Sequence, residues 1–220
     1  MVHIISIEGN IGSGKSTFVR LLNNYYQEEN VSNKKIYFLE EPVNIWETIK
    51  NEDGNNIIEC FYKDQDKYAF SFQMMAYISR LSLLRKAIKE GYDYIFTERC
   101  INTDRNVFAK MLYDSGKIEK INYQIYVKWF DEFISEFSNF HYIYIKTDAK
   151  IALDRVNKRA RSGESIPFEY LQECDKYHND WLENIENVLV LNGNVNRNDD
   201  DNYSDWIELI DKSLITLLKV

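Results

Sequence analysis

The sequence is poor in cysteine, proline and glycine, and it has no long hydrophobic run. Only 3 Cys, 2 Pro and 8 Gly occur among 220 residues, which excludes collagen-like and low-complexity chains. The three cysteines are widely separated and form no C-x-x-C pair, so neither a disulfide framework nor a zinc cluster is expected. No apolar run approaches the ~20 residues of a membrane span, and a strand-like segment begins where a leader peptide would lie. These absences predict a cytoplasmic protein with free thiols and no membrane partner.

Positive charge is also scarce. The chain has 27 Lys and Arg against 35 Asp and Glu, which gives a formal net charge of −8. Such a balance argues against binding to nucleic-acid phosphates or to an anionic membrane surface, because both attract basic surfaces. No nucleic-acid partner is therefore expected, whereas a small anionic ligand is still compatible with a local basic pocket.

Short β-branched runs alternate with segments of helical periodicity along the chain. The expected strands are residues 2–7, 35–39, 93–97, 141–146 and 188–191. The expected helices are residues 16–27, 68–90, 122–137, 169–185 and 203–218. This alternation predicts an α/β fold, in which a five-stranded parallel sheet is covered by helices on both faces. The polar segment 194–202 is expected to be a surface loop and not a domain boundary, because a boundary there would leave too small a C-terminal piece; residues 1–220 are therefore expected to form a single domain.

Residues 9–16 match the phosphate-binding pattern G-x-x-x-x-G-K-[ST], between the first expected strand and the first expected helix. The candidate triphosphate contacts are Gly9, Asn10, Ile11, Gly12, Ser13, Gly14, Lys15, Ser16 and Thr17. Glycines let successive N–H groups turn inward, and the helix N-terminus adds its positive dipole end. Lys15 is expected to reach the β- and γ-phosphates and Ser16 to bind Mg²⁺. The pattern predicts ATP or a similar donor; its alternative is a glycine-rich turn that binds nothing.

Among P-loop proteins, the rest of the sequence favours a small kinase. A GTPase would carry an N-K-x-D motif, which residues 33–36 and 157–160 both fail, and a motor ATPase would be larger and present a basic face. Glu41 follows the second strand, and Glu98 and Arg99 follow the third, at the sheet edge where ligands bind. Glu41 can accept a hydroxyl proton, while Glu98 can hold Mg²⁺ and Arg99 can meet a phosphate. The alternative for each is a solvated strand end.

Five blocks of sequence resemble the deoxyribonucleoside kinase family, which includes deoxycytidine and deoxyguanosine kinases and the insect multisubstrate enzyme. They are GNIGSGKST at 9–17, EPVNIW at 41–46, FSFQMMAYISR at 70–80, ERCINTDR at 98–105 and RVNKRARSGESIPFEYL at 155–171. The blocks follow the family order over nearly the whole chain. The resemblance implies a P-loop kinase of nucleotide salvage that transfers the γ-phosphate of ATP, or of another nucleoside triphosphate, to the 5′-hydroxyl of a 2′-deoxynucleoside. It also implies a homodimer, since family members are commonly dimers.

The resemblance further implies catalytic roles. Glu41 would be the general base for the 5′-hydroxyl, Glu98 an acid associated with Mg²⁺, and Arg99 a group that stabilises the transferring phosphoryl.

An arginine-rich lid at about 155–167 is also implied, with Arg155, Arg159 and Arg161 closing over the donor phosphates. Residues 150–161 carry five basic side chains and one acid, and guanidinium groups suit a delocalised phosphoryl charge. A solvated basic helix end is the alternative.

The acceptor pocket is expected along the long helix, where Gln73, Ala76 and Arg80 share one face. A polar stripe on an apolar helix is typical of a ligand wall. The resemblance assigns Phe72 and Trp46 to the base, Gln73 to its polar edge, and Tyr62 and Glu164 to the 3′-hydroxyl. For Phe72 and Trp46, packing in the core is an equal alternative.

Arg80 and Asp104 bear on the choice of base, together with Ala76. Relatives that prefer thymidine carry apolar residues at the positions of Arg80 and Asp104, whereas those acting on deoxycytidine or deoxypurines pair an arginine with an aspartate. Asp104 can accept a hydrogen bond from an exocyclic amino group, and thymine has none there. Deoxycytidine or a deoxypurine, rather than thymidine, is therefore the expected acceptor. Two rival functions are a nucleoside monophosphate kinase and a non-enzymatic nucleotide-binding switch.

Overall fold

The computed structural model describes residues 2–28, 34–160, 164–195 and 203–217. At its centre is a five-stranded parallel sheet with the strand order β2-β3-β1-β4-β5. The strands are β1 (His3–Glu8), β2 (Ile36–Leu39), β3 (Tyr94–Glu98), β4 (Phe140–Lys146) and β5 (Leu189–Asn192). The predicted α/β fold is confirmed, and every strand end lies within one residue of its expected position.

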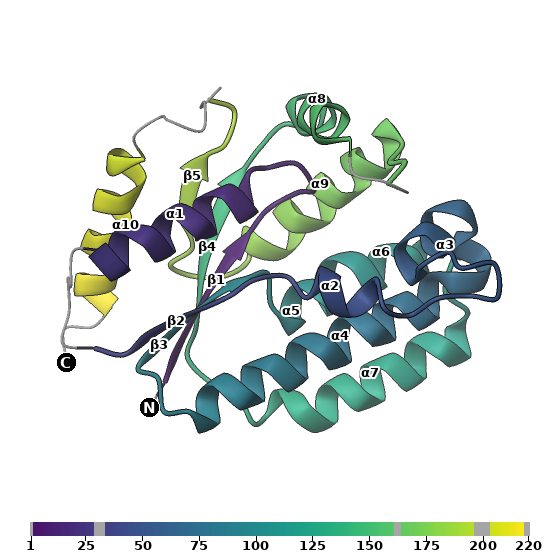
Figure 1. Ribbon diagram of the computed structural model, residues 1–220, viewed down its shortest axis with the longest axis horizontal. Helices are drawn as coiled ribbons and strands as arrows, with labels where there is room; N and C mark the ends of the chain where they lie inside the picture. The colour runs from purple at the N-terminus through teal and green to yellow at the C-terminus, as the bar shows by residue number, and fades with distance from the viewer. Residues whose placement is uncertain (1, 29–33, 161–163, 196–202, 218–220) are drawn as a thin grey trace.

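Helices cover both faces of this sheet (Figure 1). They are α1 (Lys15–Glu28), α2 (Val43–Trp46), α3 (Ile57–Lys63), α4 (Gln65–Lys89), α5 (Ile101–Thr103), α6 (Lys110–Asp114), α7 (Lys120–Ile134), α8 (Ala149–Arg159), α9 (Phe168–Leu182) and α10 (Ser204–Leu217). A π-helix, η1 (Asp104–Ala109), joins α5 to α6. The periodicity predicted α1, α4, α7, α9 and α10, and it missed the others.

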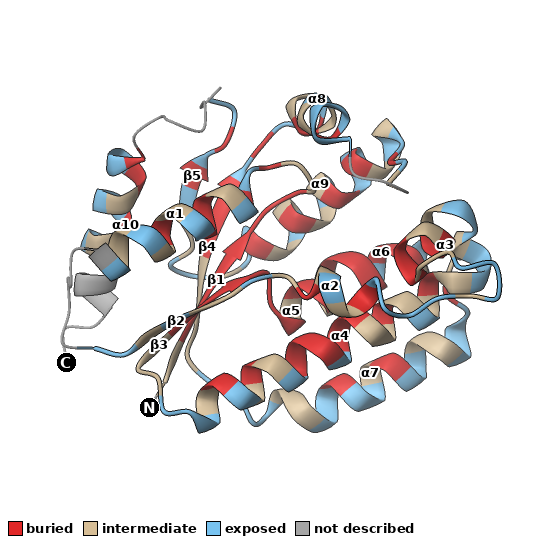
Figure 2. Ribbon diagram, in the orientation of Figure 1, coloured by how far each residue is buried: buried red, intermediate tan, exposed pale blue. Residues whose placement is uncertain are grey.

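The sheet is buried on both faces, as its central strand shows. Ile4 and Ile5 of β1 are fully buried and point to opposite sides. Ile5 packs with Phe18 of α1 in the cluster that also includes α10, whereas Ile4 packs with Tyr77 of α4 in the cluster that includes α7. Buried residues accordingly follow the strands and the inner faces of these helices in Figure 2. Strands covered on both sides need continuous apolar runs, which explains why their positions were predictable.

The parallel sheet places the polar strand ends together. The loop after β1 contains residues 9–14, Glu41 lies two residues beyond β2, and Glu98 ends β3. Because parallel strands all point the same way, these three segments meet at the carboxyl edge of the sheet. Within the described residues, no helix combines the length and the apolar character that a membrane crossing requires.

Candidate functional site

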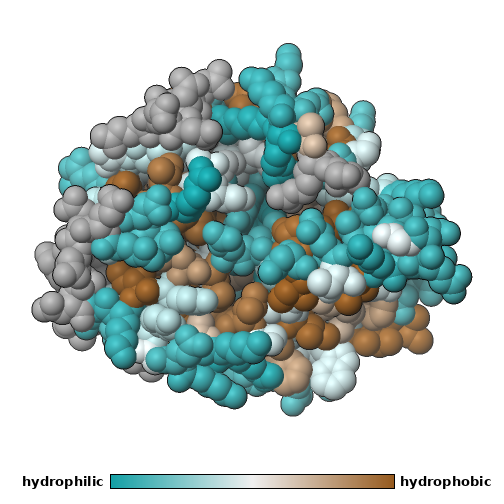
Figure 3. Space-filling model, in the orientation of Figure 1, coloured by the Kyte–Doolittle hydropathy of each residue, from teal (hydrophilic) through white to brown (hydrophobic). Residues whose placement is uncertain are grey.

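A cleft of about 1050 Å³ opens at the carboxyl edge of the sheet. In the space-filling view it is a hollow below α8 (Figure 3). The residues that the sequence predicted for the site line this cleft, apart from Gly9, Asn10 and Arg161. Gly9 and Asn10 belong to the loop but do not line the cleft, and Arg161 lies outside the described residues. Segments that are far apart in the sequence therefore contribute to one cavity.

The loop between β1 and α1 depends on two glycines with left-handed backbones. Gly12 has φ 81° and Gly14 has φ 95°, a region that other residues rarely adopt. A Cβ on Gly12 would lie 2.4 Å from the carbonyl oxygen of Ala152, so the loop packs directly on α8. A Cβ on Gly14 would meet nothing within 4 Å, so this glycine borders open space.

Lys15 is buried beneath this loop. Its Nζ donates to the carbonyl oxygen of Asn10 at 2.7 Å and lies 3.4 Å from Ser13 Oγ. Burial and the neighbouring charge of Arg99 lower the pKa of Lys15 to about 7, although nearby carboxylates act in the opposite direction. A desolvated lysine held by neutral acceptors is suited to bind an anion, because the anion would stabilise its proton.

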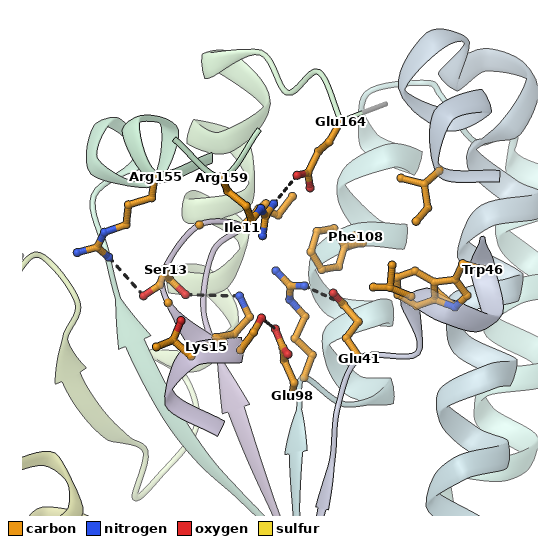
Figure 4. Close-up of a pocket in the computed structure, with 18 of the residues that line it drawn as sticks. Ile11, Ser13, Lys15, Glu41, Trp46, Glu98, Phe108, Arg155, Arg159 and Glu164 are labelled. Carbon is orange, nitrogen blue, oxygen red and sulfur yellow. Dashed lines mark hydrogen bonds and ion pairs between the residues drawn. The ribbon is translucent and has the colours of Figure 1, made fainter. Parts of the chain in front are cut away.

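Glu41 faces two arginines across the cleft. Its Oε1 accepts hydrogen bonds from Arg80 Nη2 at 2.6 Å and from Arg99 Nη1 at 2.9 Å. Burial would raise the pKa of Glu41, but the charges of Arg99, Arg80 and Lys15 outweigh burial and lower it to about 2. Figure 4 shows Glu41, Glu98 and Lys15 pointing towards the same space. Glu41 is therefore ionised throughout the neutral pH range.

Arg99 has a strained backbone. Its φ is 59°, which is left-handed and unusual for a residue with a side chain. The backbone N–H of Arg99 donates to the Ile7 carbonyl at 3.1 Å, and Nη2 donates to the Gly9 carbonyl at 3.3 Å. Its guanidinium lies 5.0 Å above the centre of the Phe108 ring. Strain of this kind is typical of functional sites.

The candidate magnesium ligands lie side by side. Ser16 Oγ donates to Glu98 Oε1 at 2.7 Å at the start of α1. A hydroxyl and a carboxylate are hard oxygen ligands of the kind that Mg²⁺ takes in phosphate sites, where substrate and water supply the other ligands. No group of three or more His, Cys, Asp or Glu residues that could hold a metal occurs in the described part of the chain. The Ser16 hydroxyl and the Glu98 carboxylate fit Mg²⁺ that is bound together with phosphates.

The acceptor side of the cleft contains buried polar groups. Gln73 is 3% exposed, and its Oε1 has no hydrogen-bond partner among the described residues. Asp104 is 2% exposed and lies 3.1 Å from Arg80 Nε. Burial raises the pKa of Asp104 to about 6, even though Arg80 favours its charged form. An unpartnered amide oxygen in a cavity indicates a ligand that donates a hydrogen bond.

Aromatic rings form the walls around these groups. Phe72 meets Trp46 edge to face with centroids 5.4 Å apart, and Trp46 Nε1 donates to Ser79 Oγ at 2.9 Å. Tyr62 and Ala76 also line the cleft. Phe72 and Trp46 thus pack together and border the cavity at the same time, so the two interpretations of these rings are compatible.

Basic side chains lie over the triphosphate loop. Arg155 Nη1 donates to the Ser13 carbonyl at 3.4 Å, and its Nη2 donates to the Val195 carbonyl at 2.8 Å. Arg159 forms an ion pair with Glu164 across the mouth of the cleft (Figure 4). This contact joins a donor-side arginine to the residue expected at the acceptor sugar.

Sequence reasoning missed several lining residues. They are Val43, Ile58, Phe61, Phe108, Lys158, Tyr170, Gly193, Val195, Tyr203 and Trp206. Phe108 and Asp104 both lie in the π-helix η1, so helical periodicity gave no signal for Phe108. The last four lie around β5 and α10. These segments are far from the loop at residues 9–14 in the sequence, and only folding brings them near it.

Fold and cleft together define a P-loop phosphotransferase with room for an acceptor beside its triphosphate site. A family model described as deoxynucleoside kinase matches residues 5–216, and the chain belongs to this family. The resemblance inferred from the five sequence blocks is thereby confirmed. The protein is an enzyme that phosphorylates deoxynucleosides with a nucleoside triphosphate as donor.

Curated relatives agree over most of their length. Deoxycytidine kinase from Homo sapiens is 30% identical, with 97% of this chain and 91% of the relative covered. Deoxycytidine kinase 2 from Gallus gallus is 31% identical, with 87% of this chain and 82% of the relative covered. The mitochondrial deoxyguanosine kinase of Xenopus laevis is 29% identical, with 93% of this chain and 86% of the relative covered.

Proposed function

We propose that the cleft transfers the γ-phosphate of ATP, or of another nucleoside triphosphate, to the 5′-hydroxyl of a deoxynucleoside, with Glu41 as general base. The observation that carries this proposal is the Glu41 carboxylate, which faces the cleft at 2.6 Å from Arg80 and 2.9 Å from Arg99. With a pKa of about 2, Glu41 takes the proton only once the hydroxyl oxygen has begun to bond to phosphorus. This timing suits the loose transition state of phosphoryl transfer.

The donor phosphates would lie against the loop amides and Lys15. Their charge would be neutralised by Arg99 and by the α8 side chains of Arg155 and Arg159. Arg161, in the lid at 155–167, is a further candidate for this role. Ser16 and Glu98 would hold Mg²⁺, which when bound neutralises charge on the phosphate oxygens.

The acceptor base is proposed to be cytosine or a purine rather than thymine. Asp104 can accept from an exocyclic amino group, while Arg80 holds its carboxylate at 3.1 Å. Gln73 offers a buried oxygen that needs a donor. A thymine carbonyl in this place would face the Asp104 carboxylate without offering it a donor, which is costly in a buried site. Tyr62 and Glu164 are proposed to contact the 3′-hydroxyl.

A homodimer is proposed through α4 and α7, which lie side by side in Figure 1. Ile78, Ile121, Ile125 and Trp129 on these helices are 42–63% exposed, and brown atoms gather over this region in Figure 3. An apolar patch of this kind is typical of an interface. Light scattering should give twice the chain mass, and Trp129→Glu should halve it; a wild-type monomer would contradict the proposal.

A cytoplasmic location is likewise proposed, because all three cysteines are buried free thiols. We also propose that residues 1–220 form one domain and that the protein has no nucleic-acid partner.

Glu41→Gln tests the proposed chemistry. We expect turnover to fall by about 10² or more, the usual scale for loss of a general base, with donor binding nearly unchanged. Glu40→Gln is the matched control, because Glu40 is the preceding, exposed glutamate and does not line the cleft. Wild-type turnover in Glu41→Gln would contradict the assignment of the base.

A further inference from the structure

Glu8 is a fully buried carboxyl group at the end of β1, and none of the roles above uses it. Its Oε1 accepts hydrogen bonds from Ser6 Oγ at 2.5 Å, Thr103 Oγ1 at 2.7 Å and Cys100 Sγ at 3.5 Å. Its Oε2 has no partner among the described residues. Burying a carboxyl group costs free energy that an apolar residue would not cost. A role beyond stability is therefore expected for it.

Three consecutive residues, Ile7, Glu8 and Gly9, bind the turn formed by residues 99–103. The carbonyl oxygen of Ile7 accepts from the backbone N–H of Arg99 at 3.1 Å, and that of Gly9 accepts from Arg99 Nη2 at 3.3 Å. Glu8, between them, binds Cys100 and Thr103, the residues that continue the same turn. The end of β1 thus contacts the turn at its backbone, at the arginine side chain and at the helix start beyond it.

The turn needs such support because Arg99 adopts φ 59°. A non-glycine residue in this conformation costs of order 1–3 kcal/mol and persists only where the surroundings impose it. Thr103 Oγ1 also accepts from the backbone N–H of Cys100 at 3.1 Å. One hydroxyl therefore links the peptide that follows Arg99 to the Glu8 carboxyl.

We propose that Glu8 is a positioning residue, which locks residues 99–103 against the start of the triphosphate loop and thereby aims Arg99 at Glu41 and the transferring phosphoryl. The proposal rests on the proposed role of Arg99. Because Gly9 directly follows Glu8, the same carboxyl ties the donor loop to the turn from which Asp104 emerges. One buried side chain thus fixes the position of the donor half of the site relative to the acceptor half.

Two variants remove the link from its two ends. Glu8→Met keeps the length of the side chain without an acceptor, and Thr103→Val keeps the shape of threonine without the hydroxyl. We expect kcat to fall at least about tenfold, and up to about 10²-fold, the scale of a misplaced catalytic group. KM for both substrates should change little, because Arg99 acts in the transition state. Thr103→Ser should restore kcat, and Ser6→Ala, which removes a hydroxyl on the strand side, should leave it unchanged.

The decisive comparison uses Arg99→Ala. If Glu8 acts through Arg99, Glu8→Met should lower kcat in the wild-type enzyme but not further in the Arg99→Ala background. Equal losses in both backgrounds, or wild-type kcat in folded Glu8→Met, would overturn the proposal. Wild-type kcat in Arg99→Ala itself would instead refute the proposed function of Arg99. Should Glu8→Met not fold, Thr103→Val in the same two backgrounds gives the same test.

Discussion

Lys15 should take up a proton when the triphosphate donor binds. In the free protein, burial and the charge of Arg99 lower the pKa of Lys15 to about 7. A bound triphosphate places negative charge at the loop and raises this pKa again. Donor binding above pH 7 is therefore coupled to protonation of one buried amine.

The size of the effect follows from the pKa. At pH 8 a group with a pKa of about 7 is only about 9% protonated, so donor binding should take up about 0.9 proton. The apparent Kd at pH 8 should be about elevenfold higher than in the fully protonated state, because only the protonated fraction is competent. ATP itself is fully ionised at this pH and releases no proton of its own.

Isothermal titration calorimetry of ATP in Hepes and in Tris at pH 8 measures this uptake, because the two buffers have different ionisation enthalpies. Lys15→Arg is the matched control. Because a guanidinium stays protonated at this pH, the binding enthalpy of this variant should not depend on the buffer. A wild-type uptake near zero, or an equal uptake in Lys15→Arg, would refute the coupling.

Three other features predict measurable effects. Burial raises the pKa of Asp104 to about 6, so kcat/KM for deoxycytidine should fall below that pH, by up to about tenfold per unit, as the carboxylate gains a proton. Gly12→Ala should lower the free energy of unfolding by about 1–3 kcal/mol and weaken donor binding, because its Cβ would lie 2.4 Å from the Ala152 carbonyl oxygen. His3 Nδ1 and His141 Nε2 are 3.1 Å apart, and burial lowers both pKa values. Their contribution to stability is present above about pH 6.5 and is lost as the pH falls through the lowered values, so the melting temperature should drop between about pH 7 and 5, and less steeply in His141→Gln.

Controls separate these effects from general damage. Gly54 has φ 84°, but a Cβ at this position would meet open space, so Gly54→Ala measures the backbone strain without the clash. Equal destabilisation by both glycine variants would contradict the contact with α8. A kcat/KM for deoxycytidine that stays flat from pH 7 to 5 would contradict the role of Asp104. Parallel acid melting curves for wild type and His141→Gln would exclude the histidine pair.

Much of the fold could be predicted because its signals are local. The isoleucines of His3–Glu8 indicate a strand buried on both faces, directly before a complete phosphate-binding motif. Amphipathic helices such as Lys15–Glu28 also carry their period in the sequence. The four-residue helix Val43–Trp46 is too short to show a period. The π-helix Asp104–Ala109 departs from the helical repeat, so periodicity could not find it.

Many residues that line the cleft could be named from the sequence, but their contacts could not. The motif and the resemblance supplied Glu41, Arg80 and Arg99, yet their pairing joins residues 39 and 58 positions apart. Glu8 gave no signal, because a glutamate at a strand end is usually solvated. Its partner Thr103 is 95 residues away, and only the pairing of β1 with β3 brings the two together.

The most direct measurement uses γ-labelled ATP with deoxycytidine, deoxyadenosine, deoxyguanosine, thymidine and their 5′-monophosphates. The geometry of Glu41 and Asp104 predicts label on the 5′-oxygen of free deoxynucleosides that carry amino groups. Thymidine should react at least about 10² more slowly, since its carbonyl would face the Asp104 carboxylate where an amino group is expected. Transfer to the monophosphates alone, or equal rates for thymidine and deoxycytidine, would contradict the proposed acceptor site.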